Sequence, residues 1–546
     1  MSNQKSVFLN KNFFLVIALF LVYGCASIQR PQGGPRDLTP PKLLKATPEN
    51  MTRNFNAKQI RLEFDEFYKL SNQYQEITIS PTQEKQPEYN INRKNLIIEF
   101  KDTLQKNTTY VINFGKAIQD VNESNVLKNF TYVFSTGPHI DSLSMSGNVV
   151  NSTTNEKEKE ATVMIFPISQ DSLLFGKKKP SIFTTTDSSG NFSLNNLHEG
   201  TYRIYALKEA SPDKIFNNDA ELIAFSNKPI VLNKDTSNIK LSLFKQIPDN
   251  FRVTEKKFNN DGTISIVFNR RLEKPSLKIL YPPNLDNQKI VEYNKTLDSG
   301  KVYMRNMDFD SLSVAILENN KPLDTIYQRK GRKESFVRNL VFKYNLNRDG
   351  RLKPGNDLHI TANLPIESYE QGLITLSEDS VNVTYNLTKD TADIKSVYVK
   401  YRFRPGRKYQ LLINESAFTD IYGDKNKKTG IPFEADKPEN YSTLTLKVTV
   451  PDTSKSYVVE LLDAQKVVLR SDAITKTTSL TYKGYLTGKY NVRVVYDRNK
   501  NGRWDSGNVK QRLQPENIWI YDKEITLRPN WEAEEPISVP KEPVTP

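Results

Sequence analysis

The stretch IRLEF at residues 60–64 alternates apolar and polar side chains, which is the pattern of a β-strand with one buried face. Short apolar segments of the same kind follow at 96–100 and 110–114, and FTYVFSTG at 130–137 ends the series. Short strands that alternate with turn-forming residues are typical of an antiparallel β-sandwich. We therefore expect an all-β fold, whose first sandwich spans residues 39–137.

The length and composition of the chain indicate several such domains. The chain has 546 residues, too many for one hydrophobic core, which suggests about four or five domains. Its 26 tyrosines and 27 phenylalanines favour strands over helices. A single cysteine excludes an intramolecular disulfide, so each domain must be held by its own core and strand ladders.

Several features of residues 39–137 resemble the bacterial Ig-like domain family called Big_5 or SbsA-like. The features are Pro40, Pro41, the strand ending at Phe64 with Asp65 and Glu66, the corner at Asn107, Thr108, Thr109 and Tyr110, Asp120, and the closing Phe134, Ser135, Thr136 and Gly137. The resemblance implies an Ig-like sandwich. We expect the hydroxyl of Tyr110 to fix a corner, and Asp65 and Asp120 to organise loops rather than act as catalytic acids.

Residues 140–247 have a different spacing of predicted strands and turns. The stretch TTTDSSGNFSLNNLHEGTYRIYAL at 184–207 places polar turns before and after a strand. It resembles the carboxypeptidase-regulatory or Cna-B-like β-sandwich, which is prealbumin-like, at Asp187, Gly190, Phe192, Leu197, Gly200, Tyr202 and Ala206. The resemblance implies a structural module and brings no peptidase chemistry.

Ig-like patterns start again near Phe251 and near Leu358. They predict two more Ig-like sandwiches, at 248–351 and 352–437, divided near Arg351. A single larger, interrupted domain over the same stretch is the alternative.

The last predicted sandwich, residues 438–540, echoes the second. Its Gly488 and Tyr490 correspond to Gly200 and Tyr202 of the second sandwich. The short remainder, residues 541–546, is predicted to be a loose tail.

The N-terminus predicts export and lipidation. Two lysines precede an apolar run at 13–22, which is typical of a signal peptide and is shorter than the roughly 20 residues of a membrane-spanning helix. The sequence VYGC at 22–25 resembles the bacterial lipobox, which implies removal of residues 1–24 and acylation of Cys25. Two or three acyl chains, at about 0.8 kcal/mol per buried CH₂, would anchor the chain firmly in a membrane. An ordinary signal peptide with an incidental cysteine is the alternative.

The residues after the cysteine bear on the location. Residues 25–38 are predicted to be the lipid anchor and a flexible tether. No aspartate directly follows Cys25, which implies delivery to the outer membrane by resemblance to Gram-negative lipoproteins. Some Gram-negative lipoproteins carry an acidic cluster just after the cysteine as a signal for export to the cell surface. No acidic residue occurs here between Cys25 and Asp37, so we favour the periplasmic face, with the cell surface as the alternative.

The net charge of +14 is spread over the whole chain, with 77 basic residues mixed among 63 acids. No dense basic run occurs, so nucleic acid is not expected as a partner.

The sequence offers no recognisable catalytic centre. Its three histidines, His139, His198 and His359, fall in three predicted domains, which argues against a Ser-His-Asp triad or a multi-histidine zinc site. The sole cysteine is assigned to the anchor. We therefore expect no enzymatic activity and no catalytic residues.

One loop has the spacing of a calcium site. Asp497, Asn499, Asn501 and Asp505 alternate as in an EF-hand loop, with a glycine at the sixth position, but Asn508 stands where the bidentate glutamate belongs. An Asx-rich hairpin turn is the alternative that we favour. Apart from this possible Ca²⁺, no cofactor is expected.

These features predict a structural lipoprotein, anchored in the outer membrane through Cys25. The expected role is a non-catalytic scaffold that binds other envelope proteins, as an accessory subunit of an assembly or export complex. A glycan- or peptidoglycan-binding lipoprotein, with Trp504, Trp519 and Trp531 as a stacking platform, is the second hypothesis. A hydrolase is the third.

Overall fold

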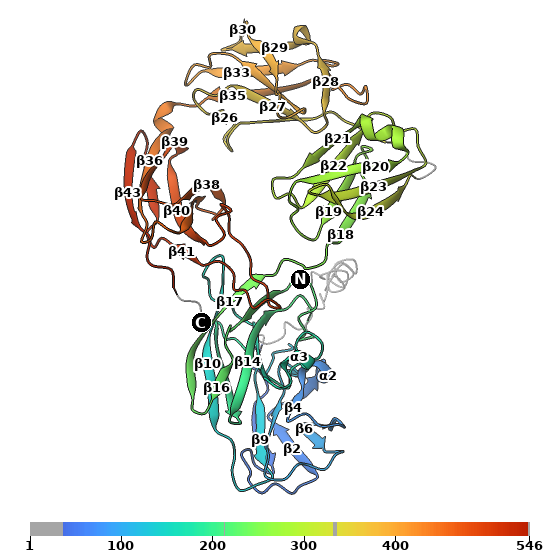
Figure 1. The fold of residues 1–546 in the computed structure, drawn as a ribbon, viewed down its shortest axis with the longest axis vertical. Coiled ribbons are helices and arrows are strands. Elements are labelled where there is room, and N and C mark those ends of the chain that lie inside the picture. Colours follow the sequence, from blue (N-terminus) through green and yellow to red (C-terminus); the bar gives the residue numbers. More distant parts are fainter. Residues whose placement is uncertain (1–36, 212, 331–335, 544–546) are drawn as a thin grey trace, which may run out of the picture. The chain divides into compact units, whose positions relative to one another are not determined.

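The computed structural model describes residues 37–211, 213–330 and 336–543, and it confirms the predicted all-β fold (Figure 1). Among these residues the α-helices are single turns, α2 (Gln73–Glu76) and α3 (Asp171–Leu174), and the 3₁₀ helices are η1 (Pro283–Gln288), η2 (Gln371–Leu373) and η3 (Pro438–Asn440). The chain divides into two compact units, Met1–Ile140 and Asp141–Pro546, called unit 1 and unit 2.

Unit 1 is a sandwich. Its strands are β1 (Leu43–Thr47), β2 (Gln59–Phe64), β3 (Tyr68–Leu70), β4 (Thr78–Ser80), β5 (Glu88–Asn92), β6 (Asn95–Glu99), β7 (Thr109–Asn113), β8 (Ile118–Asp120) and β9 (Thr131–Ser135). They form the sheets β1-β2-β6-β5 and β4-β7-β9, with β3 paired to β8. Along β2 the side chains of Ile60, Leu62 and Phe64 are fully buried and the intervening ones are exposed, so the predicted alternation is confirmed.

Unit 2 begins with the second sandwich. Its strands are β10 (Leu143–Asn151), β11 (Thr162–Pro167), β12 (Ile182–Thr185), β13 (Asn191–Leu197), β14 (Gly200–Lys208), β15 (Leu222–Phe225), β16 (Ile230–Leu232) and β17 (Thr236–Lys245). They form one eight-stranded sheet in the order β12-β11-β14-β15-β17-β10-β13, with β16 added to β14. Strands β10 and β17 run parallel, and the other pairs are antiparallel.

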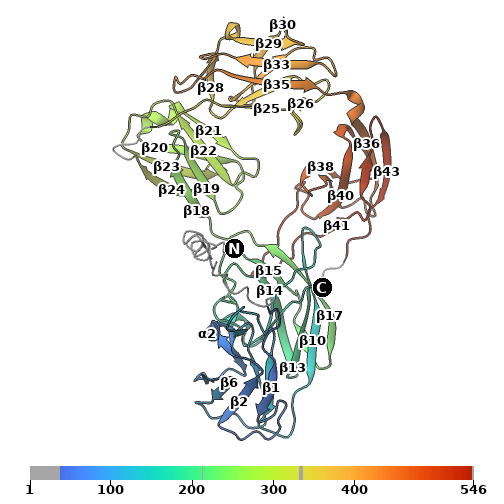
Figure 2. The same cartoon turned by 180° about the vertical axis from the view of Figure 1, so that it is seen from behind.

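The last sandwich repeats this topology. Its strands are β36 (Tyr441–Thr449), β37 (Ser456–Asp463), β38 (Val468–Ile474), β39 (Thr478–Leu486), β40 (Gly488–Asp497), β41 (Ile518–Ile520), β42 (Ile525–Leu527) and β43 (Glu532–Ser538). Strand β36 pairs with β39 and lies parallel to β43, as β10 does with β13 and β17. Figure 2 shows β36 beside β43 and β10 beside β17. Strand β40 pairs with β37, β41 and β42, as β14 does with β11, β15 and β16. The predicted echo between the two domains therefore extends to the strand pairing.

The third and fourth sandwiches follow the first. The third contains β18 (Val253–Phe258), β19 (Ile264–Phe268), β20 (Pro275–Tyr281), β21 (Lys289–Tyr293), β22 (Ser299–Met304), β23 (Ser311–Glu318) and β24 (Lys321–Arg329). The fourth contains β25 (Phe342–Tyr344), β26 (Arg351–Leu352), β27 (Leu358–Ala362), β28 (Ile366–Tyr369), β29 (Ile374–Glu378), β30 (Val381–Val383), β31 (Asn386–Lys389), β32 (Ser396–Lys400), β33 (Lys408–Ile413), β34 (Phe418–Asp420) and β35 (Thr429–Ala435). The orders β18-β19-β22-β21 and β25-β27-β32-β31 both match β1-β2-β6-β5 of unit 1.

Residues 248–437 contain two separate apolar cores. One is built from residues of the third sandwich, such as Ile266 and Val314. The other is built almost entirely from the fourth and includes Leu340, which precedes the division that the sequence placed near Arg351. Strand β25 pairs with β27, so the fourth sandwich begins ahead of residue 351.

Candidate functional sites

The anchor residue Cys25 and the signal peptide lie outside the described residues, so their assignment stays a prediction. No helix in the part of the chain that the structure describes combines the length and apolar character of a membrane span.

The histidines occupy separate positions. His139 belongs to unit 1, whereas the other two belong to unit 2. His198 Nδ1 lies 3.2 Å from Asp141 Oδ1, and the ring of His359 stacks on that of Tyr398 with 4.4 Å between centroids. Within residues 37–543, apart from the undescribed gaps, no group of three or more His, Cys, Asp or Glu side chains is placed to hold a metal ion.

The four residues of the predicted calcium loop do lie in one turn. Asp497 is buried, and its carboxylate accepts hydrogen bonds from the backbone N–H groups of Asn501 and Gly502 at 3.1 and 3.0 Å. The side-chain amides of Asn499 and Asn501 both donate to Asp505 Oδ2. This is the bonding of an Asx-rich turn, in which the carboxylates already have donors from their own loop. Binding of Ca²⁺ stays a prediction.

The sequence reasoning missed Glu516, which organises the same loop. Its side chain is buried and accepts from the backbone N–H groups of Arg498 and Asp505 at 2.7 and 3.0 Å. Burial raises the pKa of Glu516. A carboxyl that bridges the two ends of a loop in this way fixes the loop's shape.

The tryptophans do not form one stacking platform. The indole N–H of Trp504 donates to the backbone carbonyl of Glu516 at 2.9 Å. Trp519 packs against the core of the last sandwich, and Trp531 is 46% exposed beside Arg528. Packing against apolar clusters accounts for the positions of Trp504 and Trp519.

The segment from 498 to 517, called here the 498–517 loop, packs against the second sandwich. Val509 is 6% exposed and enters an apolar cluster on a face of that sandwich's sheet. Beside it, a Cβ added to Gly507 would lie 2.7 Å from the ring of Phe244, so the backbone of the loop sits directly on that ring. The other buried members of the cluster are Met164, Phe166, Phe183, Tyr205, Leu207, Ile223 and Phe225.

Hydrogen bonds surround this apolar contact. The backbone N–H of Val509 donates to Gln246 Oε1 at 2.8 Å, Gln514 Nε2 donates to the carbonyl of Phe225 at 2.8 Å, and Arg512 Nη2 donates to the hydroxyl of Tyr205 at 2.7 Å. Arg512 also pairs with Asp171, and Lys510 pairs with Asp249 at 2.8 Å. The loop thus joins the second and the last sandwich through an apolar centre with a polar rim, which is the composition of a specific interface.

Neighbouring sandwiches of unit 2 also have buried contacts. Tyr303 of the third sandwich is fully buried in the core cluster of the fourth. The guanidinium of Arg338 lies 3.9 Å from the centre of the Tyr422 ring. Between the fourth and the last sandwich, the buried carboxylate of Asp436 accepts from the hydroxyl of Tyr441, the first residue of β36, at 3.1 Å.

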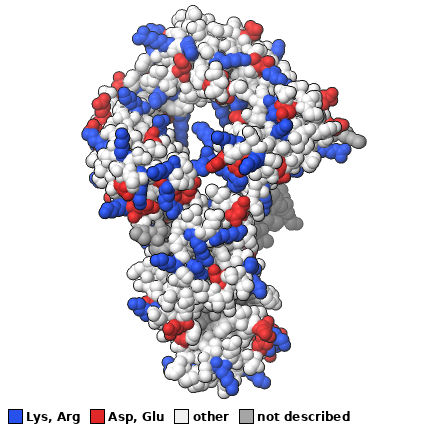
Figure 3. Space-filling view, in the orientation of Figure 1, with Lys and Arg blue, Asp and Glu red and all other residues white. Residues whose placement is uncertain are grey.

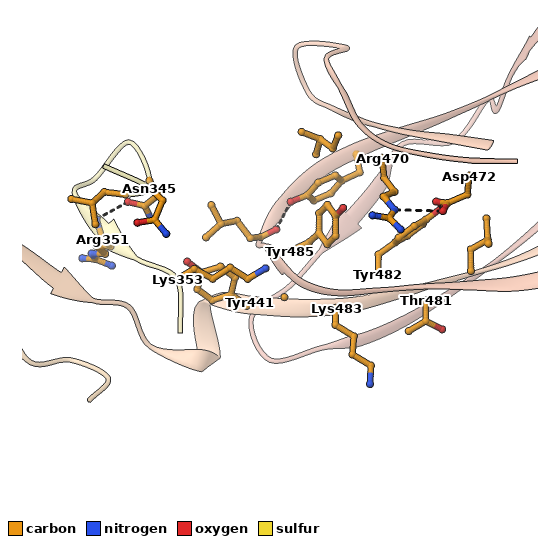
Figure 4. A pocket seen from close by; sticks show the side chains of 17 residues that line it. Asn345, Arg351, Lys353, Tyr441, Arg470, Asp472, Thr481, Tyr482, Lys483 and Tyr485 are labelled. Atoms are coloured by element: carbon orange, nitrogen blue, oxygen red, sulfur yellow. Dashed lines mark hydrogen bonds and ion pairs between the residues drawn. The ribbon is translucent and has the colours of Figure 1, made fainter. Parts of the chain in front are cut away.

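A cavity of about 700 Å³ lies beside that last junction (Figure 4). One wall consists of residues 345–353 of the fourth sandwich, and the other of β38 and β39 of the last. Figure 4 shows Arg470, Asp472 and Tyr482 close together, with dashed contacts at Asp472. The lining residues are Asn345, Leu346, Asn347, Arg351, Lys353, Tyr441, Leu469, Arg470, Asp472, Leu480, Thr481, Tyr482, Lys483, Gly484, Tyr485, Leu486 and Tyr490.

Glu378, at the end of β29, is the centre of an ionic cluster in the fourth sandwich. Its buried carboxylate accepts from Arg404 Nε at 2.7 Å and from the hydroxyls of Tyr401 and Tyr409 at 2.8 and 2.9 Å. The hydrogen bonds from Arg404, followed by those from the two tyrosines, hold the pKa of Glu378 at about 2, against an ordinary value of 4.5.

Substitution Glu378→Gln is expected to destabilise the fourth sandwich locally by about 1–3 kcal/mol at neutral pH, because the buried Tyr409 hydroxyl loses its charged acceptor. Arg404 is 60% exposed, so its ion pair is screened and contributes little of this. A depressed carboxyl pKa stabilises the fold above pH 4.5, and that stability is lost as the pH falls through about 2. Pulse-labelling hydrogen exchange of residues 374–413 in urea, at pH 7 and at pH 2, will measure the difference.

Glu415→Gln, at an exposed position, is the control. A deficit of equal size at both pH values would contradict this account.

The corner and loop residues of unit 1 have the roles predicted for them. The hydroxyl of Tyr110 accepts from the backbone N–H of Gln105 at 2.8 Å. Asp120 accepts from the N–H groups of residues 123, 124 and 125, and Asp65 accepts from that of Lys42 at 2.8 Å. Residues 37–136 match the family model of the bacterial Ig-like domain.

The bacterial Ig-like corner recurs outside the matched residues. In the fourth sandwich the hydroxyl of Tyr409 accepts from the backbone N–H of Arg404 at 2.7 Å, five residues earlier as in unit 1. Asp420 accepts from the N–H groups of Tyr422 and Asp424, which is the role of Asp120. Together with the strand order, these contacts make the fourth sandwich similar in structure to unit 1.

Comparison with solved structures finds other chains of β-domains. The major pilin subunit BcpA of Bacillus cereus is 9% identical, with 73% of this chain and 99% of the pilin covered at a TM-score of 0.14. The surface layer protein SbsC, domains 1–6, is 10% identical, with coverages of 89% and 67% and a TM-score of 0.14. The Bacillus anthracis TIE protein is 10% identical, with coverages of 93% and 75% and the same score. With TM-scores this low, these matches bear neither on the arrangement of the sandwiches nor on their role. No protein with a curated description matches this sequence.

Proposed function

We propose that this chain is a lipid-anchored, non-catalytic scaffold of the bacterial outer membrane, whose sandwiches hold other proteins of the cell envelope. The observation that supports it most is how the buried acids are used. Asp120, Asp497 and Glu516 all accept hydrogen bonds from backbone N–H groups of their own loops. Carboxylates committed to loop structure serve to present a fixed surface rather than to transfer protons.

The contacts within unit 2 support the same role. The 498–517 loop ties the last sandwich to the second, and Tyr303 and Asp436 are buried at the junctions between. These contacts join the sandwiches of unit 2, and exposed strand edges can accept a partner's strand. On the face drawn in Figure 3, basic and acidic side chains are interspersed, which suits protein partners better than a polyanion.

The location rests on the N-terminal sequence. The VYGC stretch at 22–25 supports a lipid on Cys25, and the acid-free residues that follow support the periplasmic face of the outer membrane. Protease treatment of intact cells tests the face: a periplasmic protein is protected until the outer membrane is opened, whereas a surface protein is cleaved at once.

Mild crosslinking in the native host followed by purification from membranes tests the scaffold role. The wild-type protein should be recovered with partner proteins in fixed stoichiometry. Cys25→Ala should leave the membrane fraction, and Ser27→Ala, two residues away, should stay in it. Recovery of the wild-type protein without partners would overturn the scaffold proposal, and a membrane-bound Cys25→Ala would overturn the anchor.

A further inference from the structure

The cavity between the fourth and the last sandwich has a marked imbalance of charge. Four of its lining side chains are cationic, Arg351, Lys353, Arg470 and Lys483, and one, Asp472, is a carboxylate. Asp472 is already engaged, because it pairs with Arg470 at 3.4 Å and accepts from the hydroxyl of Tyr482 at 3.0 Å. The cavity therefore carries uncompensated positive charge.

The two lysines are the available cations. Among the described residues, neither Lys353 nor Lys483 forms an ion pair with a carboxylate. Lys353 instead lies over the ring of Tyr441, with its Nζ 5.9 Å from the ring centre. An ammonium group held beside a concave surface without an acidic partner favours an anionic ligand.

Tyrosine rings give the cavity its apolar surface. The Tyr485 ring is half-buried and meets those of Tyr482 and Tyr490 edge to face, with centroids 6.0 and 5.9 Å away. Its hydroxyl makes no hydrogen bond to another described residue. A phenol ring with a free hydroxyl can pack against the C–H face of a sugar and bond one of its hydroxyl groups.

The rest of the lining is suited to a polar, ring-shaped ligand. Asn345, Asn347 and Thr481 add amide and hydroxyl groups to the walls. A volume of about 700 Å³ falls within the ordinary range of small-ligand sites. The edge-to-face arrangement of the three rings leaves no parallel pair to sandwich a nucleobase, whereas a sugar needs a single ring face.

From this combination we infer that the cavity binds an acidic saccharide, with a carboxylate of the ligand held by Lys353 and a sugar ring packed on Tyr485. Uronic acids carry such a carboxylate on the sugar itself, whereas in the muropeptides of the cell wall the carboxylates belong to the peptide linked to the sugar. The inference does not depend on the scaffold proposal or on the lipid anchor.

The test uses the purified full-length protein and isothermal titration with defined probes. The acidic probes are trigalacturonic acid and a disaccharide-tetrapeptide muropeptide, which distinguish the two sources. The methyl ester of the trigalacturonate is the neutral counterpart, and a thymidine decanucleotide tests for a nucleic-acid site. Saturable binding of either acidic probe, at least 10-fold tighter than that of the ester, is the expected result.

Variants assign the binding to the cavity. The double variant Lys353→Met, Lys483→Met should weaken binding at least 10-fold. The control Lys400→Met, Lys476→Met removes the same charge at exposed positions away from the cavity and should bind as the wild type does. Tyr485→Phe should retain most of the affinity, since the ring remains. Absence of binding by both acidic probes, equal binding of the ester, tighter binding of the oligonucleotide, or equal losses in both double variants would each overturn the inference.

Discussion

Replacing Val509 by aspartate will release the 498–517 loop from the second sandwich while both sandwiches remain folded. Val509 is 6% exposed in an apolar cluster of phenylalanine, leucine and isoleucine side chains, and Phe244 lies beside its loop. A carboxylate there would be buried among apolar side chains, and the guanidinium of Arg512, which lies over the Tyr205 and Phe225 rings, is already paired with Asp171. Its burial therefore costs on the order of several kcal/mol. The loop can avoid this cost by moving into water, because the cores of the two sandwiches do not depend on it.

Hydrogen exchange monitored by mass spectrometry will show this release. A loss of about 3 kcal/mol raises the open population roughly 100-fold, so peptides that cover 498–517 and β15 should exchange correspondingly faster. Strands β36 and β37 should keep their protection. Val231→Asp makes the same chemical change at a position of the second sandwich that is 65% exposed, and should leave the loop protected. Unchanged exchange in Val509→Asp would mean that the apolar contact does not hold the loop.

The strands could be predicted because their signal is local. Alternation along 60–64 marks a strand with one buried face whatever lies far away in sequence, and β2 is buried as that pattern requires. The same holds for the corner at Tyr110, whose hydrogen-bond partner is five residues away. It also holds for the echo of the second sandwich in the last, since the turn before Tyr490 resembles the turn before Tyr202.

The docking of the 498–517 loop could not be predicted in this way. Its partners, such as Gln246 and Phe225, lie more than 250 residues earlier, and Val509, Arg512 and Gln514 look like ordinary loop residues. One signal was present: in β11 the side chains from Thr162 to Phe166 are all buried, and such a continuous run requires cover on both faces of the sheet. The apolar stretch VMIF at 163–166 is the trace of this burial in the sequence, but it does not indicate which segment covers the second face.

The candidate cavity could not be predicted from the sequence either. Lys353 and Tyr485 are 132 residues apart by their numbering, and each is unremarkable in its own segment. What distinguishes them is a free ammonium group and a free hydroxyl on facing walls, which is a property of packing between two domains.

Replacing Phe134 by alanine will destabilise unit 1 by about 3–5 kcal/mol, the usual cost of removing a buried aromatic side chain. The ring of Phe134 is fully buried and meets four others. Its centroid lies 4.1 Å from that of Phe55, 5.2 Å from Tyr110, 5.6 Å from Phe100 and 6.1 Å from Tyr132. Its removal leaves a cavity at the point where β9 contacts the Tyr110 corner, and the neighbouring rings cannot all collapse into it.

Phe67→Ala is the matched control, because Phe67 lies in the same unit but is 59% exposed, with a single cation, Lys94, over its ring at 5.7 Å. Its loss should cost less than about 1 kcal/mol. Exchange in increasing urea, followed separately in peptides from residues 43–135 and from unit 2, will assign the change to unit 1. If Phe134→Ala lowered the stability of unit 2 as much as that of unit 1, the two units would unfold together. If it cost no more than Phe67→Ala, the aromatic cluster would not be what holds this sandwich.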